Sequence, residues 1–383
     1  MTDNQILLFY SLGIILVIFV AWKVLKFLIE IAWKGLCDIF YRYNTILVIL
    51  YIFFLFPIAA CHILILGWLD ESDDTAFESE EIEEDKSIAP INEELNSKIK
   101  ASKSKNVKKL LALNACDGGD LSGENLSKFE LEGASIQKAD LSGANLSFTK
   151  LFGAVLFKSN LNNANLERAN LVYAKCWDAQ FKNANLRYGD LSRANLENAN
   201  FENANLEGVN LENAILKGAN LENANLEGAL LSGASFEKAT LVNANLSSSE
   251  IGSANFNSAN LYKAKLNSVN LGRRYFDNSS ILTSFKNADL SEVEFTQSTL
   301  MKVKFEGANL NKANFSGTEL PHSNFTNSNL SKANLTGAIL RDANFTNANL
   351  EDANFTESDL RDTNINKAVL SNTIMPWGIE NEN

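Results

Sequence analysis

The chain has 383 residues, of which 46% are hydrophobic, and it carries 34 Lys and Arg against 46 Asp and Glu. This length allows two or three domains, and the net charge of −12 argues against direct binding of nucleic acid, because phosphate contacts need clusters of basic residues. Four cysteines and two histidines, without a C-x-x-C pair, give no zinc-type ligand set. We therefore predict no metal, no cofactor and no small-molecule substrate.

Residues 1–69 are predicted to form a membrane hairpin. Residues 6–22 and 46–69 are almost entirely apolar, and both runs are long enough to cross a bilayer as helices. Residues 23–45 between them alternate basic and acidic side chains at helical spacing, which predicts an amphipathic connector.

The basic residues near the two apolar runs predict the topology. Lys23, Lys26, Lys34 and Arg42 all lie in the connector, so the positive-inside rule places the connector in the cytoplasm. We therefore predict an integral membrane protein whose repeat domain lies on the non-cytoplasmic side. A hairpin that never crosses the membrane, with the repeat domain on the cytoplasmic side, remains the alternative.

Residues 70–105 are predicted to be a linker. Its first part, residues 70–85, holds ten acidic residues and no basic ones, so mutual repulsion keeps it extended. Composition then turns to Lys and Ser. Residues 106–115 predict a short helix that covers the open end of the next domain.

Residues 116–375 are a repeat with a period of five. From Leu121 to Ile281 every fifth residue is Leu, Ile or Phe apart from Cys176, and 22 of the 33 positions two residues earlier are Ala. A second run, one residue out of phase, extends from Phe285 to Met375. A five-residue unit is too short to turn and pair with itself, so each unit is predicted to be one side of a wound coil.

The distribution of Phe indicates four sides per coil. Phe occupies 285, 305, 325 and 345 and also 295, 315 and 355, while Leu occupies 290, 310, 330 and 350 and also 300, 320, 340 and 360, so Phe and Leu alternate with a period of ten residues. Three or five sides would place Phe over Leu, whereas four place like over like. We therefore predict an all-β, four-sided parallel β-helix of about thirteen coils of twenty residues, filled by Leu, Phe and Ala. Asn before each Leu is predicted to sit beside a corner, where it tolerates unusual backbone angles and bonds local backbone groups.

The repeated Ala-Asn-Leu and Ala-Asn-Phe, as at 194–196 and 343–345, resemble the pentapeptide-repeat family over about two-thirds of the chain. The resemblance implies a right-handed β-helix that serves as a binding surface. Some bacterial, especially cyanobacterial, relatives carry membrane helices, and this implies a cyanobacterial or related bacterial membrane. With the topology predicted above, the repeat domain is then expected in the periplasm or the thylakoid lumen. Residues 376–383 are predicted to cover the last coil.

The phase break at 272–284 is one candidate partner-binding site. If one residue is lost there, the Phe residues at 236, 256, 276 and 295 form one stack, and a kink or bulge exposes Arg273, Arg274 and Tyr275. A tolerated insertion or deletion without function is the other interpretation.

Outward Glu residues form a second candidate site. Glu202 is predicted to lie over Glu222, and Glu207 over Glu227, within an acidic belt around the middle coils. This belt is either a selected electrostatic surface for a partner or a soluble face.

Two cysteines of the repeat domain invite a disulfide. Cys116 and Cys176 are sixty residues apart, which is three coils or roughly 14 Å along the axis, and a disulfide needs Cα atoms within about 7 Å. We predict that both are reduced.

The sequence predicts a binding protein and not an enzyme, because a filled rod offers no pocket with converging polar groups. The favoured hypothesis is a membrane-anchored scaffold that docks protein partners as a structural or assembly component of a membrane complex. The alternative, from the family resemblance, is an acidic DNA mimic that binds and inhibits a type II topoisomerase.

Overall fold

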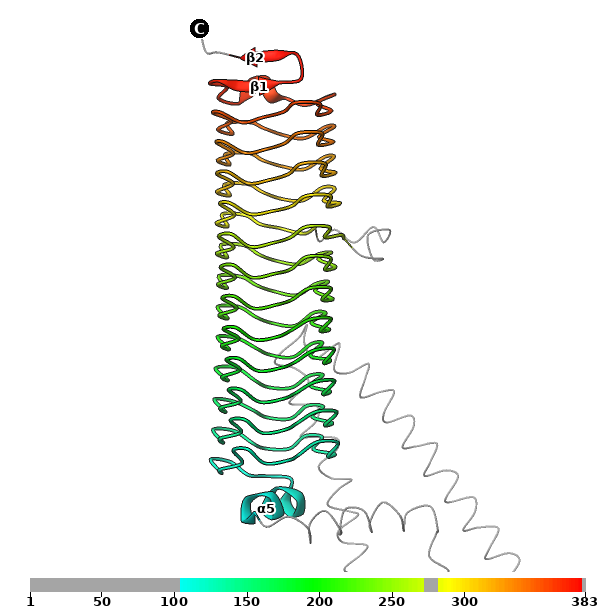
Figure 1. Cartoon of the computed structure of the whole chain (residues 1–383), viewed down its shortest axis with the longest axis vertical. Helices are drawn as coiled ribbons and strands as arrows, with labels where there is room; N and C mark the ends of the chain where they lie inside the picture. The colour runs from blue at the N-terminus through cyan, green and yellow to red at the C-terminus, as the bar shows by residue number, and fades with distance from the viewer. Residues whose placement is uncertain (1–103, 272–281, 381–383) are drawn as a thin grey trace, which may run out of the picture. The chain divides into compact units, whose positions relative to one another are not determined.

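The computed structural model describes residues 104–271 and 282–380. The chain divides into two compact units, Met1–Glu84 and Asp85–Asn383, and all described residues belong to the second. This unit is a stack of coils with a helix at one end and a β-hairpin at the other (Figure 1).

The predicted membrane hairpin, residues 1–69, lies outside the described residues. Within the described ranges, no helix is both long and apolar enough to span a bilayer. This finding overturns the prediction of an integral membrane protein, and the functions proposed below do not use a membrane.

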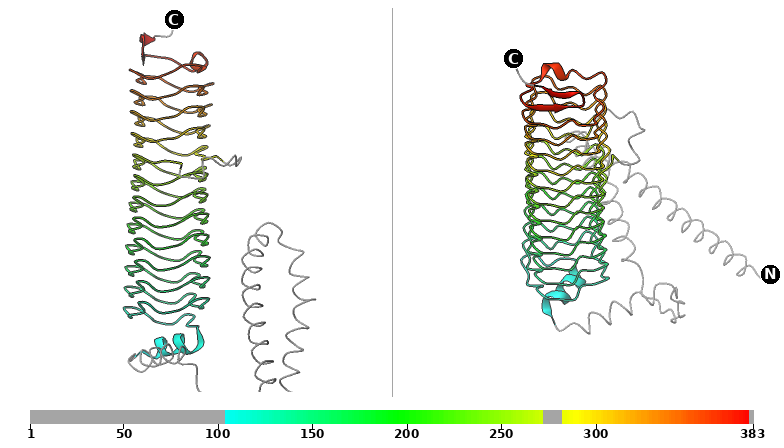
Figure 2. Two further views of the ribbon diagram at one scale, coloured as in Figure 1. Left: turned by 90° about the vertical axis from the view of Figure 1, so that its right-hand side faces the viewer. Right: turned by 45° about the horizontal axis from the view of Figure 1, so that its top comes forward.

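Each coil has four sides and twenty residues. Parallel bridges join residues twenty apart, as in Asn185↔Asn205 and Asn205↔Asn225, and they continue in four columns along the rod (Figure 2). The turns of successive coils lie above one another in four columns, which we call edges A to D and define by the first core residue that each follows. Edge A follows Leu121, edge B follows Leu126, edge C follows Leu131 and edge D follows Ile136, and each edge recurs in every coil.

The turn after each core residue has the same geometry. The carbonyl of Leu196 accepts a hydrogen bond from the N–H of Ala199 at 3.0 Å, and φ of Asn198 is +57°. Positive φ favours Gly and Asn, which occupy many of these positions. The unusual backbone angle thus lies two residues after the core residue, and the sequence prediction placed it wrongly at the Asn before.

Asn before the core residue has a different role. Asn195 takes part in a bridge to the next coil, and its side-chain oxygen accepts the N–H of Glu197 at 3.1 Å. Its local bonding was therefore predicted correctly. Stacked Asn side chains also bond one another between coils, as between Asn245 and Asn225 at 3.1 Å.

The interior is filled by the residues that the period identified. Leu, Phe and Ala at the inward positions are almost all less than 3% exposed. Phe305 and Phe325 lie on the same side of the rod, with ring centroids 4.9 Å apart and planes 3° from parallel. The four-sided prediction is thereby confirmed. Cys116 and Cys176 are buried and free, as predicted.

The phase break is an insertion and not a deletion. Asn255 pairs with Ser284 and Asn260 with Asp289, both 29 residues apart instead of twenty, so nine extra residues lie between Leu271 and Thr283. Phe256 stacks on Phe285, with centroids 4.8 Å apart, so the predicted stack through Phe276 was wrong. From Ala115 to Ile374 the chain advances 259 residues, and 259 minus nine gives 250, or 12.5 coils.

Short elements cover both ends of the rod. Helix α5, Lys105–Leu113, is capped at its N-terminus by Ser104, whose hydroxyl accepts a hydrogen bond from the N–H of Val107. The helix buries Val107 and Leu110 against the first coil. At the other end lie the 3-10 helix η2, Ile365–Lys367, and the antiparallel strands β1, Thr373–Met375, and β2, Gly378–Glu380. Both open ends of the coil are thus partly covered.

Candidate protein-interaction surface

The four predicted Glu residues lie in two stacked pairs on neighbouring edges. Glu202 and Glu222 are on edge A, and Glu207 and Glu227 are on edge B. The register therefore brings them together as the sequence predicted. With three further outward Glu residues they form a group that we call the belt: Glu197, Glu202, Glu207, Glu212, Glu222, Glu227 and Glu237.

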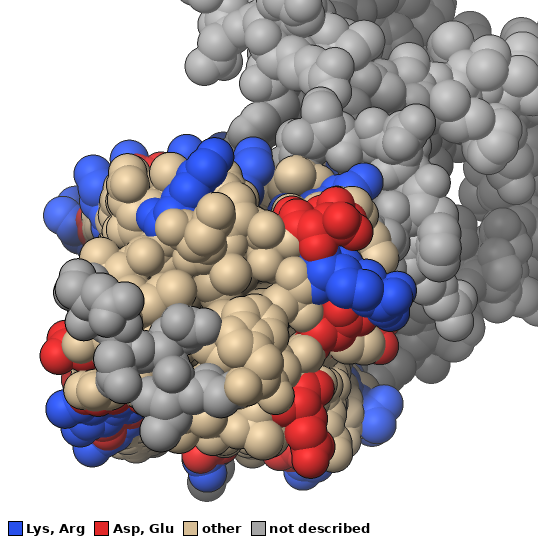
Figure 3. Space-filling model, turned by 90° about the horizontal axis from the view of Figure 1, so that it is seen from above, with Lys and Arg blue, Asp and Glu red and all other residues tan. Residues whose placement is uncertain are grey.

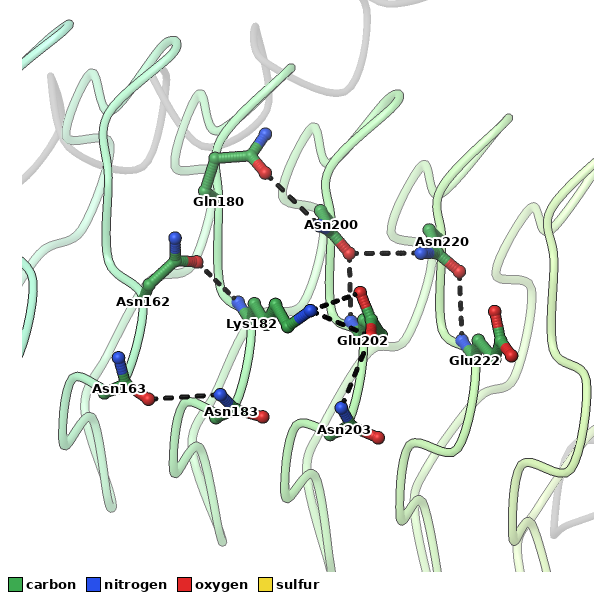
Figure 4. Close-up of polar contacts among 10 residues, drawn as sticks. All are labelled: Asn162, Asn163, Gln180, Lys182, Asn183, Asn200, Glu202, Asn203, Asn220 and Glu222. Carbon is green, nitrogen blue, oxygen red and sulfur yellow. Dashed lines mark hydrogen bonds and ion pairs between the residues drawn. The ribbon is translucent and has the colours of Figure 1, made fainter.

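On edge A the belt begins with an ion pair between coils. Lys182 Nζ lies 2.9 Å from both carboxylate oxygens of Glu202, and the backbone N–H of Glu202 donates to Asn200 (Figure 4). Asn220 continues the same Asn column one coil later. Glu222, the next carboxylate, has no cation within ion-pair distance among the described residues.

Edge B repeats this arrangement. Arg187 Nη2 lies 2.8 Å from Glu207 Oε1, and the Tyr188 hydroxyl donates to the same oxygen at 3.0 Å. These bonds, the one from Arg187 foremost, hold the pKa of the Glu207 carboxyl below its ordinary value. Glu227, one coil further, accepts a hydrogen bond from Asn245 but has no ion pair with a described residue. On edges A and B, the first Glu residues of the belt are thus neutralised by cations of the preceding coil, and those one coil further keep their negative charge.

The other predicted contact residues, Arg273, Arg274 and Tyr275, lie outside the described residues. Their role in a partner contact stays a prediction.

A surface that the sequence analysis missed lies on the N-terminal side of the belt. Residues 146–193 carry aromatic and basic side chains at the turn positions of edges B, C and D. We call this group the collar: Phe148, Phe152, Phe157, Lys158, Arg168, Tyr173, Trp177, Arg187, Tyr188 and Arg193.

The collar side chains contact one another from coil to coil. Arg168 and Arg187 both lie over the ring of Tyr188, 5.2 Å and 5.1 Å from its centroid. Phe157 packs against Trp177 with centroids 4.8 Å apart and ring planes tilted by 31°. Such cation–π and aromatic contacts are worth about 0.5–1.5 kcal/mol each at exposed sites, so they fix the side chains in place without burying them.

Several collar rings remain open to solvent. Phe148 is 51% exposed, and Phe152 and Tyr188 are each 44% exposed. A turn position has no packing role that calls for a large ring, and exposed aromatic clusters beside Arg are typical of binding hot spots. The signal was present in the sequence as aromatic residues one or two places after a core residue.

Collar and belt carry opposite charge on adjoining coils. Residues 146–193 hold seven Lys and Arg and three Asp and Glu, which gives 7 − 3 = +4. Residues 197–237 hold one Lys and seven Glu, which gives 1 − 7 = −6. Seen along the axis from the C-terminal end, the charged side chains lie around the rim, while the visible middle of the end face is uncharged (Figure 3).

One cavity, of about 360 Å³, lies at the C-terminal end and is lined by Asp359, Arg361 and Trp377 among others. Arg361 donates to both oxygens of Asp359, at 2.8 and 2.7 Å, and Arg341 donates to one of them, so this carboxylate is fully engaged. No group of three His, Cys, Asp or Glu placed to hold a metal occurs in the described ranges.

Comparison with known proteins identifies the repeat. The model for pentapeptide repeats in eight copies matches within residues 116–147 and 149–273, in overlapping segments, and the model for the pentapeptide repeat region matches within 279–374. A search of curated proteins gave no match.

Solved structures of three similar proteins have the following relation to the chain. HetL of Nostoc sp. strain PCC 7120, involved in heterocyst differentiation regulation, is 28% identical over 73% of this chain and 100% of its own, with a TM-score of 0.21. Rfr23 of Cyanothece 51142 is 29% identical over 39% and 98%, with a TM-score of 0.19. QnrB1, a plasmid-mediated fluoroquinolone resistance protein, is 19% identical over 59% and 91%, with a TM-score of 0.28.

Members of the matched family form right-handed quadrilateral β-helices, which agrees with the twenty-residue coil and its four columns of bridges. The chain belongs to the pentapeptide-repeat family.

Proposed function

We propose that the chain is a protein-docking rod that holds partners on its outer surface and catalyses no reaction. The observation that carries this proposal is the collar, a cluster of half-exposed rings and cations at positions where the fold needs neither. Arg, Tyr and Trp are the residues that most often dominate the energy of protein interfaces.

The rod supports docking because it is rigid before a partner arrives. Every side is bonded to the coil above and below by backbone hydrogen bonds of about the same length, as from Tyr188 to Glu207 at 3.0 Å and from Gly208 to Glu227 at 2.8 Å. Side chains held on such a frame lose little conformational entropy on binding, and this favours affinity.

The packing of the same rod supports the proposal that the protein is not catalytic. The inward positions of the described coils are mostly Leu, Phe and Ala, and the outward polar groups are spread along ladders instead of converging. The alternative of a DNA mimic for a type II topoisomerase is disfavoured by the collar, because its charge of +4 interrupts the acidic surface. A supercoiling assay with purified enzyme tests it.

The experiment for docking compares three forms of the full chain as bait in quantitative affinity purification from the source cells. They are the wild type, a collar variant with Phe148→Ser, Phe152→Ser and Tyr188→Ser, and a control with Tyr262→Ser on edge A. Partners are expected to disappear with the collar variant and to remain with the control. The proposal is wrong if all three forms recover the same proteins in the same amounts.

A further inference from the structure

The geometry points to a second copy of this chain as an occupant of the collar. We propose that the face between edges B and C pairs with the same face of another copy, antiparallel, about a dyad beside the boundary of collar and belt. This inference rests on the proposed docking function and names the partner.

Charge is divided along this face. On the collar half, Lys150 and Arg168 point outward beside the acids Glu167 and Asp190, and Lys150 is ion-paired with Glu130 at 2.6 Å. On the belt half, Glu227 and Glu250 point outward. Arg168 contacts the ring of Tyr188 but has no ion pair with a described residue, and the same is true of Glu227 and Glu250. The collar half of the face is thus net positive and the belt half is negative.

Side-chain size is divided in the same way. Along edge B, Phe148, Arg168 and Tyr188 are followed at twenty-residue steps by Gly208, Gly228 and Ser248. Along edge C, the large side chains Phe152, Tyr173 and Arg193 give way to small ones further along, Ser232, Gly233 and Gly252. One half of the face thus carries large turn side chains and the other half small ones, and the Tyr188 ring extends over Gly208.

A dyad makes the two halves meet. An axis in the plane of the face, crossing the rod between positions 188 and 208 of edge B, brings each edge opposite itself in the second copy. It pairs Phe148 with Ser248, and the turn of Glu167 and Arg168 with the turn of Glu227 and Gly228. In the middle of the face it pairs Lys150 with Glu250. Each contact occurs twice, as in isologous dimers, and the contact spans six coils, roughly 29 Å at about 4.8 Å per coil.

A second copy fits this face better than an unrelated acidic protein does, because the complement is present at the matching height on the same edges. An unrelated partner would need a negative, concave surface with this spacing. In the chain itself, the spacing follows from the twenty-residue coil.

The test is charge reversal with rescue, measured by analytical ultracentrifugation of the full chain. Arg168→Glu and Glu227→Arg, each alone, are expected to raise the dimer dissociation constant at least about tenfold, because each places like charges together twice. The double variant restores opposite charges across the dyad and is expected to recover the wild-type constant. The matched controls Lys332→Glu and Glu351→Arg, both on edge A, lie off the face and outside collar and belt, and they should leave it unchanged.

A steric pair of variants tests the half with small side chains. Ser248→Trp fills the place opposite Phe148 and is expected to give a monomer, while Ser268→Trp, one coil further on the same edge, keeps the dimer. Both positions have positive φ already, so both substitutions meet the same backbone.

Cross-linking fixes the register. Positions 168 and 227 are about three coils apart in one chain, roughly 14 Å, too far for a disulfide within it. A mixture of Arg168→Cys and Glu227→Cys chains is expected to give an oxidised heterodimer joined at these positions, identified by peptide mass spectrometry.

A wild type that sediments as a monomer at every soluble concentration overturns the inference, and so does a dimer that neither charge reversal weakens. If that monomer still recovers partners through the collar, the docking function stands and the self-pairing alone is refuted. If the collar recovers none either, both are refuted.

Discussion

Replacing Phe305 with alanine is expected to destabilise the rod more than the same replacement at Phe355. Both side chains are completely buried, so both lose similar apolar contact with the core. Their surroundings differ. Phe305 has four ring neighbours, two stacked and two edge-on: Phe285 at 5.4 Å, Phe325 at 4.9 Å, Phe295 at 6.0 Å and Phe315 at 5.9 Å.

The difference in unfolding free energy between the two variants follows from the number of ring contacts that each Phe makes. A buried Phe→Ala substitution costs about 3–5 kcal/mol of unfolding free energy. Among the described rings, Phe355 contacts Phe345 alone, edge-on at 6.0 Å. Each aromatic pair adds about 0.5–1.5 kcal/mol beyond area burial. Three more pairs at Phe305 therefore predict a difference of about 1.5–4.5 kcal/mol between the variants.

The assay is equilibrium denaturation of the full chain in guanidinium chloride, followed by circular dichroism. Phe355 lies nearer the end of the rod, so Leu310→Ala and Leu350→Ala, both at fully buried positions, measure the effect of location by itself. The reasoning is refuted if the Phe variants differ by no more than the Leu variants do.

Three further outcomes are expected. Thr149→Val removes a buried hydroxyl that donates to the Leu126 carbonyl at 2.8 Å and should cost about 1 kcal/mol of unfolding free energy, measured by denaturation; no change would mean that this bond adds nothing. Glu207→Gln removes the charged hydrogen bonds between Glu207 and Arg187. In the wild type these bonds stabilise the folded state fully above the unfolded carboxyl pKa of 4.5, and the stabilisation disappears as the pH falls through the lower folded pKa. The difference between the denaturation midpoints of this variant and the wild type should therefore shrink from pH 7 to pH 3, and a constant difference would contradict the assignment. Burial raises the pKa of the Cys176 thiol, so alkylation mapped by mass spectrometry should label it only after unfolding, and labelling of the folded chain would show that the core opens.

The interior of the rod could be predicted because the inward residues recur every five residues and the coils every twenty, so residue number alone identifies which side chains are buried together. Phe305 and Phe325 stack because the coil has twenty residues, and the alternation of Phe and Leu revealed that number. The backbone angle at the corner was misplaced because Asn is frequent at two positions of the unit. The structure separates a bridging Asn, such as Asn195, from a turn Asn, such as Asn198.

The phase break shows what a five-residue period cannot determine. Phe276 and Phe295 are 19 residues apart, and Phe256 and Phe285 are 29 apart. Both 19 and 29 leave a remainder of four when divided by five, so losing one residue and gaining nine produce the same shift of phase. The stacking of Phe256 on Phe285 selects the gain, and the sequence pattern alone carries no information that would do so.

The collar was missed because the periodicity analysis concerned the inward residues. Outward turn positions are nearly free of packing constraints, and for this reason a large ring there is more informative than any Leu in the core. Surface neighbours on this fold are twenty residues apart, so Lys182 meets Glu202 and Arg187 meets Glu207 where collar and belt adjoin. These pairs use up the opposite charges at the boundary. The charges left for a partner therefore lie one coil or more away on either side, at Arg168 and Glu227.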